Sequence, residues 1–258
     1  MSKSFDRLVS IMGMLRGKEG CPWDRVQTHK TLKPYLIEEV YEVLETIDSN
    51  NSQEMCNELG DLMLQIVFHA QLATEKNKFN IDEVCERVCE KLIHRHPHVF
   101  ANTRADTPEK VLANWEKVKR LEKTNKGKSV LNGVPTSMPG LLRAWRLQNK
   151  ASSIGFDWNK TDETFDKLLE EMGELIEAYS RRDSNAIEME LGDLLFSLVN
   201  VARFLKTNPE EALRKSTNKF ISRFEYMEKA VADSGREIDK ISFKEMGELW
   251  DMAKKDGL

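Results

Sequence analysis

Two sets of five acidic residues repeat in this chain with the same spacing, and their types and positions indicate metal chemistry. In each set a Glu-Glu-x-x-Glu segment is followed by a Glu-x-x-Asp segment, and the second set lies 132 positions after the first. Carboxylates that converge repel one another and raise their own pKa values unless a cation lies among them. Magnesium, a hard divalent ion that prefers oxygen ligands, is the cation that we expect. The sets are Glu38, Glu39, Glu42, Glu58 and Asp61, and Glu170, Glu171, Glu174, Glu190 and Asp193.

The elements that must position these carboxylates are two pairs of antiparallel helices. Residues three and four apart share one face of an α-helix, so each segment presents its carboxylates on one side. Short polar turns at 48–52 and 182–184 bring the two helices of each pair together beside an apolar seam. Glu-rich helices are commonly just solvated surface. Here, however, the helices are otherwise apolar and carry mid-helix glycines, Gly60 and Gly192, which cost about 1 kcal/mol each relative to Ala.

Length and composition limit the class of protein. A chain of 258 residues suggests about two domains, and its low glycine and proline content favours an all-α fold. Charged residues make up 32% of the chain and the net charge is −4, so we expect no stable nucleic-acid binding. We expect neither a signal segment nor a membrane span. The four cysteines, all in the first half, indicate reduced thiols in a cytoplasmic protein: Cys21, Cys56, Cys85 and Cys89.

A basic and aromatic pattern recurs with the carboxylates. A Lys/Arg pair and a Trp/Lys pair, each spaced four residues apart, occur once in each half. Lysine and arginine clamp phosphate oxygens, magnesium bridges carboxylates to phosphates, and tryptophan stacks on a flat ring. The combination indicates a phosphorylated ligand with a flat ring, although each pair taken alone fits an exposed basic face or core packing better. The residues are Lys91, Arg95, Trp115 and Lys119, and Lys219, Arg223, Trp250 and Lys254.

The recurrences predict an internal duplication. We expect two tandem bundles of four or five helices, residues 1–122 and 141–258, joined by a linker at 123–140 that contains glycines and prolines. A zinc site formed by Cys85, Cys89 and nearby histidines is an alternative use of the first half. Its spacing fits no standard zinc pattern, and both cysteines also fit the apolar stripe of their helix.

These motifs resemble those of the MazG family of nucleotide pyrophosphohydrolases. Both acidic sets match the family's Glu-Glu-x-x-Glu and Glu-x-x-Asp pattern, and the similarity to two-domain bacterial MazG proteins extends over essentially the whole chain. Four further segments carry it: Gly20-Cys21-Pro22-Trp23-Asp24, Arg95-His96-Pro97-His98-Val99-Phe100, Val134-Pro135 and Gly155-Phe156-Asp157-Trp158.

The resemblance implies an all-α, magnesium-dependent enzyme, with manganese as a substitute metal. Such an enzyme hydrolyses ribo- or deoxynucleoside triphosphates between the α and β phosphates, as nucleotide-pool housekeeping, and works as a homodimer of intertwined bundles. By the matched positions, the metal ligands would be Glu39, Glu42, Glu58 and Asp61 in the first half, and Glu171, Glu174, Glu190 and Asp193 in the second. The nucleotide would be held by Lys91, Arg95, Trp115 and Lys119, and by Lys167, Lys219, Arg223, Trp250 and Lys254.

One difference separates the halves. Lys167 stands three residues before the second acidic motif, whereas Tyr35 takes that place in the first, so we expect the second half to be the principal catalytic domain. There Glu170 or Glu171, beside the ligand Glu174, would orient or deprotonate the attacking water.

Two other functions compete with the enzyme as explanations of these motifs. A di-iron carboxylate bundle requires Glu-x-x-His, and no histidine follows a motif glutamate at that spacing. The other rival is a non-catalytic nucleotide sensor or dimerisation scaffold, a role that the first half would fit.

Overall fold

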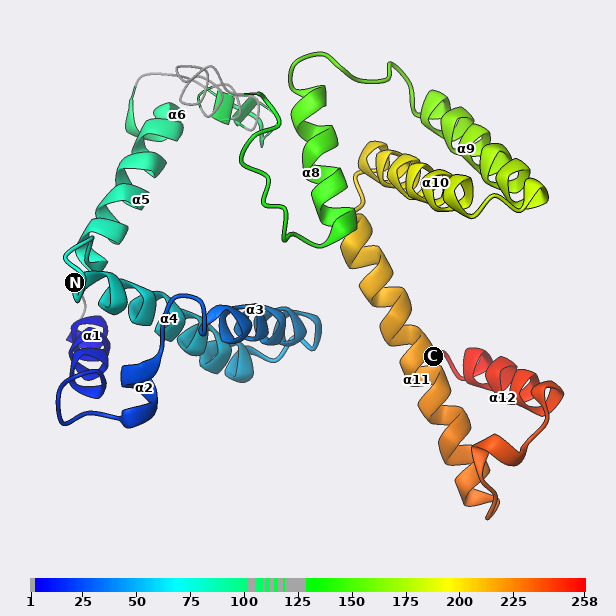
Figure 1. Ribbon diagram of the computed structural model, residues 1–258, viewed down its shortest axis with the longest axis horizontal. Helices are drawn as coiled ribbons and strands as arrows, with labels where there is room; N and C mark the ends of the chain where they lie inside the picture. The colour runs from blue at the N-terminus through cyan, green and yellow to red at the C-terminus, as the bar shows by residue number, and fades with distance from the viewer. Residues whose placement is uncertain (1–2, 102–104, 109, 112–113, 116–117, 119–128) are drawn as a thin grey trace. The chain divides into compact units, whose positions relative to one another are not determined.

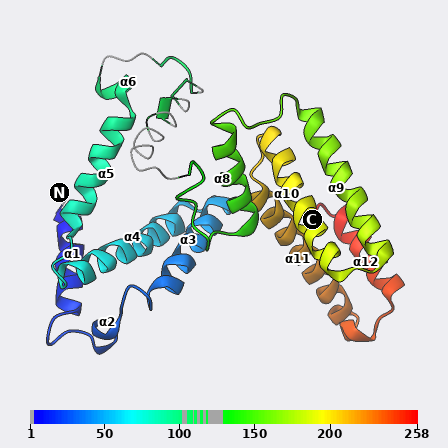
Figure 2. The ribbon, with the colours of Figure 1, turned by 45° about the horizontal axis from the view of Figure 1, so that its top comes forward.

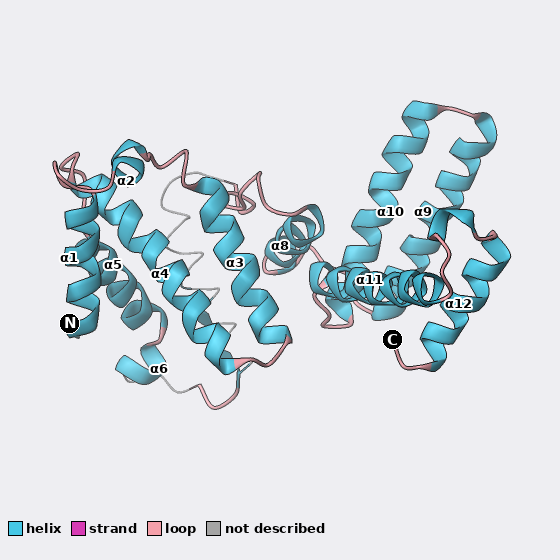
Figure 3. Cartoon of the chain, turned by 90° about the horizontal axis from the view of Figure 1, so that it is seen from below, coloured by secondary structure: helices cyan, strands magenta, loops and turns pink. Residues whose placement is uncertain are grey.

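A computed structural model describes residues 3–101, 105–108, 110–111, 114–115, 118 and 129–258, and every regular element among them is a helix (Figures 1 and 3). The predicted all-α fold is therefore confirmed. The chain divides into two compact units, Met1–Val118 and Lys119–Leu258, which are considered separately below. The expected domain boundary at 122 and the first part of the expected linker, 123–128, lie outside the described residues.

The first unit is arranged around one long helix, α4, which packs against α3, α1 and α5. Its core contains Met12, Leu32, Val67 and Phe68, each at most 3% exposed. The segment around Trp23 contains a short helix, which begins with a proline at its first position. The described helices are α1 (Lys3–Leu15), α2 (Pro22–Val26), α3 (Lys33–Asp48), α4 (Ser52–Thr74), α5 (Ile81–Arg95) and α6 (Pro97–Phe100).

The second unit contains two pairs of packed helices, α9 with α10 and α11 with α12. Helix α10 packs along α9 and also contacts α8, while α11 packs against α12 and α8. Figure 1 shows α12 folded back along α11, below the α9–α10 hairpin, and Figure 2 shows that hairpin from a second direction. The helices are α8 (Gly140–Ser152), α9 (Thr161–Arg181), α10 (Ser184–Phe204), α11 (Pro209–Asp233), the short 3₁₀ helix η1 (Ile238–Lys240) and α12 (Phe243–Lys255).

The α3–α4 pair and the α9–α10 pair, which we call the acidic hairpins, have turns of the same construction. Asn50 and Arg182 adopt left-handed backbone angles, with φ of 53° and 56°, and these residues are 132 positions apart. The next residue caps the following helix: Asn51 accepts two backbone N–H groups at the start of α4, and Asp183 accepts two at the start of α10. The caps fix where the second helix of each hairpin begins, and therefore which residues face the first helix.

None of the described helices combines the length and apolar character that crossing a membrane requires. All four cysteines are free thiols.

Replacing the cap residues is expected to weaken both hairpins. Asn51→Ala and Asp183→Ala should each lower the free energy of unfolding by about 1 kcal/mol, because two backbone N–H groups lose their acceptor. Urea unfolding followed by circular dichroism measures this loss. Ser52→Ala, at the next, exposed position, is the matched control and should change stability by less than about 0.5 kcal/mol. A loss for Ser52→Ala as large as that for Asn51→Ala would contradict the capping argument.

Candidate functional site

In the second unit, three carboxylates from two facing helices converge. Glu171 and Glu174 on α9 and Glu190 on α10 place carboxylate oxygens within 4.8 Å of one another, and we call these three residues the second acidic cluster. Glu171 is only 6% exposed, Glu190 is half-buried and Glu174 is exposed. Desolvation raises the pKa of Glu174, and the nearby charges of Glu171 and Glu190 raise it further. Three converging carboxylates with this electrostatic strain suit a hard divalent cation.

Lys167 lies against this cluster, one turn earlier on α9. The Nζ atom of Lys167 is 2.7 Å from Glu170 Oε1 and 2.8 Å from Glu171 Oε1. Hydrogen bonds to Glu170 and Glu171 raise the pKa of Lys167, so the amine is held in its charged form. The lysine expected to grip the nucleotide is therefore paired here with two of the motif carboxylates.

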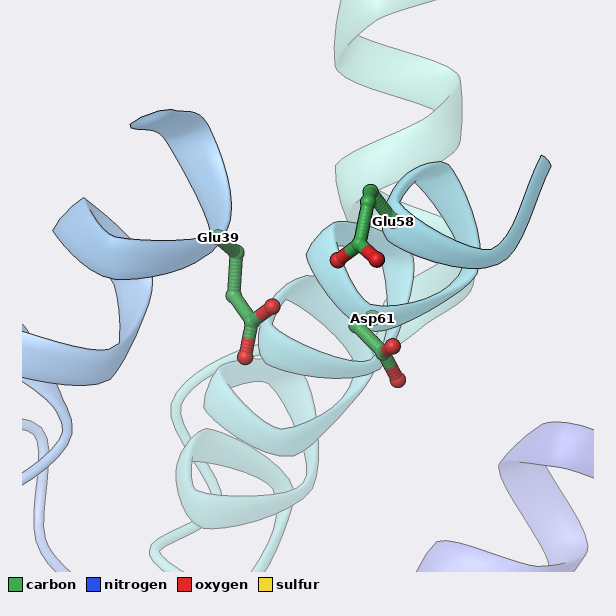
Figure 4. Close-up of side chains that lie close together, drawn as sticks. All are labelled: Glu39, Glu58 and Asp61. Atoms are coloured by element: carbon green, nitrogen blue, oxygen red, sulfur yellow. The ribbon is translucent and has the colours of Figure 1, made fainter. Parts of the chain in front are cut away.

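The first unit contains an equivalent set. Glu39 reaches from α3 toward Glu58 and Asp61 on α4 (Figure 4), and their oxygens also lie within 4.8 Å of one another; we call these three residues the first acidic cluster. Desolvation is the main cause that raises the pKa of both Glu39 and Glu58, and the charges of Asp61 and Glu42 contribute. Gln65 Nε2 donates a hydrogen bond of 3.3 Å to Glu39 Oε1.

The structure thus brings together three of the four expected metal ligands in each half. Glu42 falls outside the first cluster, although it is near enough to raise the pKa values of Glu39 and Glu58. Asp193 falls outside the second cluster and lies in a hollow next to it. Neither of the three-residue groups found among the described residues contains a cysteine or a histidine, so the zinc alternative gains no support.

The basic and aromatic residues form their own contacts, and these repeat between the units. The guanidinium of Arg95 lies 5.3 Å from the centre of the Trp115 ring, and that of Arg223 lies 5.4 Å from the centre of the Trp250 ring. Lys254 pairs with Asp251 at 2.8 Å. Lys91 and Lys219 have exposed side chains, and Lys119 lies outside the described residues.

Unlike Lys167, the basic residues Lys219, Arg223 and Lys254 do not meet the carboxylates of the second unit within one chain. They belong to α11 and α12, which pack against each other, whereas the acidic cluster belongs to the α9–α10 hairpin (Figure 1). Within residues 129–258, no ion pair joins Lys219, Arg223 or Lys254 to the carboxylates of α9 and α10.

A hollow of about 880 Å³ adjoins the second acidic cluster, and sequence reasoning missed it. Its wall includes the Lys167 and Glu171 side chains and the aromatic rings of Phe156 and Trp158, which are 80% and 42% exposed. The rest of the lining contains apolar residues and several polar side chains, among them Gln148, Asp193, Ser197, Asn200 and Arg203. A space of this size with aromatic and polar walls suits a nucleoside.

The repeat itself contained the signal for this hollow. At the shift of 132 that superposes the acidic motifs, Ser197 and Asn200 correspond to Gln65 and Phe68. Gln65 and Phe68 are 6% and 3% exposed and pack into the first unit's interior. In the first unit, larger side chains therefore occupy the positions that border the hollow in the second unit.

Comparison with known proteins agrees with the motifs and the helical repeat. The model of the MazG nucleotide pyrophosphohydrolase domain matches residues 27–100 and 160–227. The chain belongs to the MazG family. A nucleoside triphosphate pyrophosphohydrolase/pyrophosphatase MazG of Thermotoga maritima is 47% identical over 250 residues, which cover 97% of this chain and 95% of the relative. A nucleoside triphosphate pyrophosphohydrolase of Escherichia coli K12 is 42% identical over 256 residues, 97% of each chain.

Each MazG segment includes one of the two helix pairs that carry the acidic residues. The first segment spans α3, α4, α5 and α6, and the second spans α9, α10 and most of α11. The family match therefore covers the elements that position the carboxylates in both units.

The strain within the second acidic cluster predicts an unusual pH dependence. Because the pKa of Glu174 is raised above its ordinary value of 4.5, the folded protein binds more protons than the unfolded chain above that pH, and stability falls as the pH rises through this window. Glu174→Gln should therefore raise the thermal unfolding midpoint at pH 7 in a chelator, and the gain should disappear at pH 4 and below.

Glu188→Gln is the matched control, since Glu188 is an exposed glutamate of α10 outside the cluster. Adding millimolar magnesium should reverse the order of wild type and Glu174→Gln, because the variant loses a ligand. A Glu174→Gln protein that is less stable than wild type in chelator at pH 7 would show that the cluster is not strained.

Proposed function

We propose that the second unit hydrolyses nucleoside triphosphates between the α and β phosphates, in a magnesium-dependent reaction that gives a nucleoside monophosphate and pyrophosphate. The observation that carries the proposal is the second acidic cluster bordering a hollow of nucleoside size. The relatives' names give the same class of reaction. We place the activity in nucleotide-pool housekeeping in the cytoplasm, a compartment where free cysteines are usual.

Glu171, Glu174 and Glu190 would hold the metal, with Asp193 close by. Magnesium, or manganese in its place, would supply charge neutralisation for the phosphates and a more acidic attacking water. The hollow would hold the nucleoside between Lys167 and the rings of Phe156 and Trp158.

Glu170 is the base that this geometry favours. It lies outside the acidic cluster, its side chain is 57% exposed, and it forms an ion pair with Lys167. When Lys167 turns to a phosphate oxygen, Glu170 loses its cation and is free to accept the proton of the attacking water. The water oxygen then bonds to phosphorus, the bond between the α and β phosphates breaks, and its electron pair leaves with pyrophosphate.

Lys219, Arg223, Trp250 and Lys254 would reach the triphosphate from a second copy of the chain. Apolar side chains stand exposed on α9 and α11: Leu169 at 67%, Ile176 at 61%, Tyr179 at 73% and Phe220 at 56%. Exposed apolar faces of this kind mark sites of association. A homodimer that buries them would set the partner's α11 and α12 against the α9–α10 hairpin.

The first test is pyrophosphate release from a panel of ribo- and deoxynucleoside triphosphates with magnesium. Glu174→Ala should lower the rate at least about a hundredfold, because it removes a ligand that stabilises transition-state charge. Glu42→Ala, the matched change in the first unit, should leave the rate near wild type. Equal losses would mean two working sites. A wild-type protein that releases no pyrophosphate would favour the nucleotide-sensor alternative.

Mixed dimers test the contribution from the second copy. Doubly tagged heterodimers of Glu174→Ala and Arg223→Ala contain one intact site of two, so they should recover about half of the wild-type rate. Heterodimers of Glu174→Ala and Glu190→Ala are the matched control and should recover no activity. In these heterodimers the second acidic cluster of each copy has lost one carboxylate. If the first heterodimer is as inactive as the second, Arg223 acts on its own chain's carboxylates.

A further inference from the structure

One buried amide in the wall of the hollow has an oxygen that accepts no hydrogen bond from the described part of the chain. Gln148, on α8, is 8% exposed, and its Nε2 atom donates a hydrogen bond of 2.8 Å to the carbonyl oxygen of Phe196. Its Oε1 atom is buried and has no hydrogen-bond partner. Buried acceptors are nearly always paired in folded proteins, so an unpaired one that borders a hollow points to a ligand.

The orientation of this amide is fixed by the protein. Only the NH₂ group of Gln148 is able to face the Phe196 carbonyl, because a flipped amide would set two oxygens against each other. The unpaired group is therefore the oxygen, and the N–H or O–H donor of a bound ligand would satisfy it.

Phe196 links this amide to the catalytic helix. It stands on α10, three residues after Asp193 and six after Glu190, and it lines the same hollow. Ser197, the next residue, is 8% exposed and also borders the hollow. The helix that supplies carboxylates to the metal therefore also anchors Gln148, which couples the position of a bound base to that of the phosphates.

We propose that Gln148 is a specificity-determining residue whose Oε1 atom accepts a hydrogen bond from an N–H group on the edge of the nucleobase. The inference rests on the proposed function, because it assigns the hollow to the nucleoside. It names the ligand chemistry as a base with a donor N–H at that edge. Bases without that donor leave the buried oxygen unpaired and are hydrolysed more slowly.

The first unit lacks this device. At the shift of 135 that superposes Gly20 on Gly155, Gln148 corresponds to Gly13, which has no side chain. The first unit does contain a comparable buried glutamine, Gln65, whose Oε1 atom is likewise unpaired and whose Nε2 atom donates to Glu39. Gln65→Leu is therefore a chemically matched control for Gln148→Leu.

The experiment compares substrates with and without an N–H donor on the edge of the base. Steady-state kcat/KM for pyrophosphate release is measured for ATP against purine riboside triphosphate, which lacks the 6-amino group, and for UTP against 3-methyl-UTP. Wild type should prefer the donor-bearing member of at least one pair by about tenfold to a hundredfold. Gln148→Leu should bring that ratio close to one, while Gln65→Leu should keep it.

The outcomes separate this inference from the proposed function. If wild type hydrolyses the triphosphates and Gln148→Leu keeps the ratio of wild type, Gln148 does not read the base although the enzyme assignment stands. If no triphosphate is hydrolysed, the proposed function itself fails. Circular dichroism melting checks that Gln148→Leu folds, and Gln148→Met, which keeps the length of the side chain, takes its place if it does not.

Discussion

The α9–α10 hairpin holds three carboxylates close together although their negative charges repel one another. Oxygens of Glu171, Glu174 and Glu190 lie within 4.8 Å of one another, and burial and like charge raise the pKa of Glu174. The packing of α9 on α10 maintains this arrangement in spite of its electrostatic cost. The charge of Lys167 offsets part of the repulsion. A divalent cation among these carboxylates would relieve the repulsion, which is why we propose magnesium there.

The two units show how one scaffold takes two forms. Both have the capped turn, the three converging carboxylates and an arginine stacked on a tryptophan. In the first unit Tyr35 packs edge-on against Trp23, with ring centres 5.7 Å apart, where the second unit has a lysine paired with carboxylates. Phe68 is buried where the second unit has Asn200. Side chains in the first unit occupy positions that border the hollow in the second, while the three converging carboxylates occur in both units.

The acidic and basic groups of the second unit occupy different helix pairs, and exposed apolar residues cover parts of both pairs. Burial of apolar surface between two copies of the chain would explain both properties. A helix that is apolar beyond its intramolecular contacts gains stability from burial against another surface. Association of two copies would bury the apolar residues and bring the opposite charges together, so assembly and completion of the site are parts of one event.

The sequence by itself determined the all-α class, the duplication and the family, because helical spacing and motif recurrence are local properties of the chain. It also predicted the three carboxylates that converge in each unit, since residues three and four apart on one helix share a face. Only the tertiary structure decided that Lys167 pairs with Glu170 and Glu171, and that Asp193 borders a hollow beside the second cluster. The hollow and the unpaired oxygen of Gln148 also needed the structure, because both arise where α8 and α10 meet and depend on contacts between residues nearly 50 positions apart.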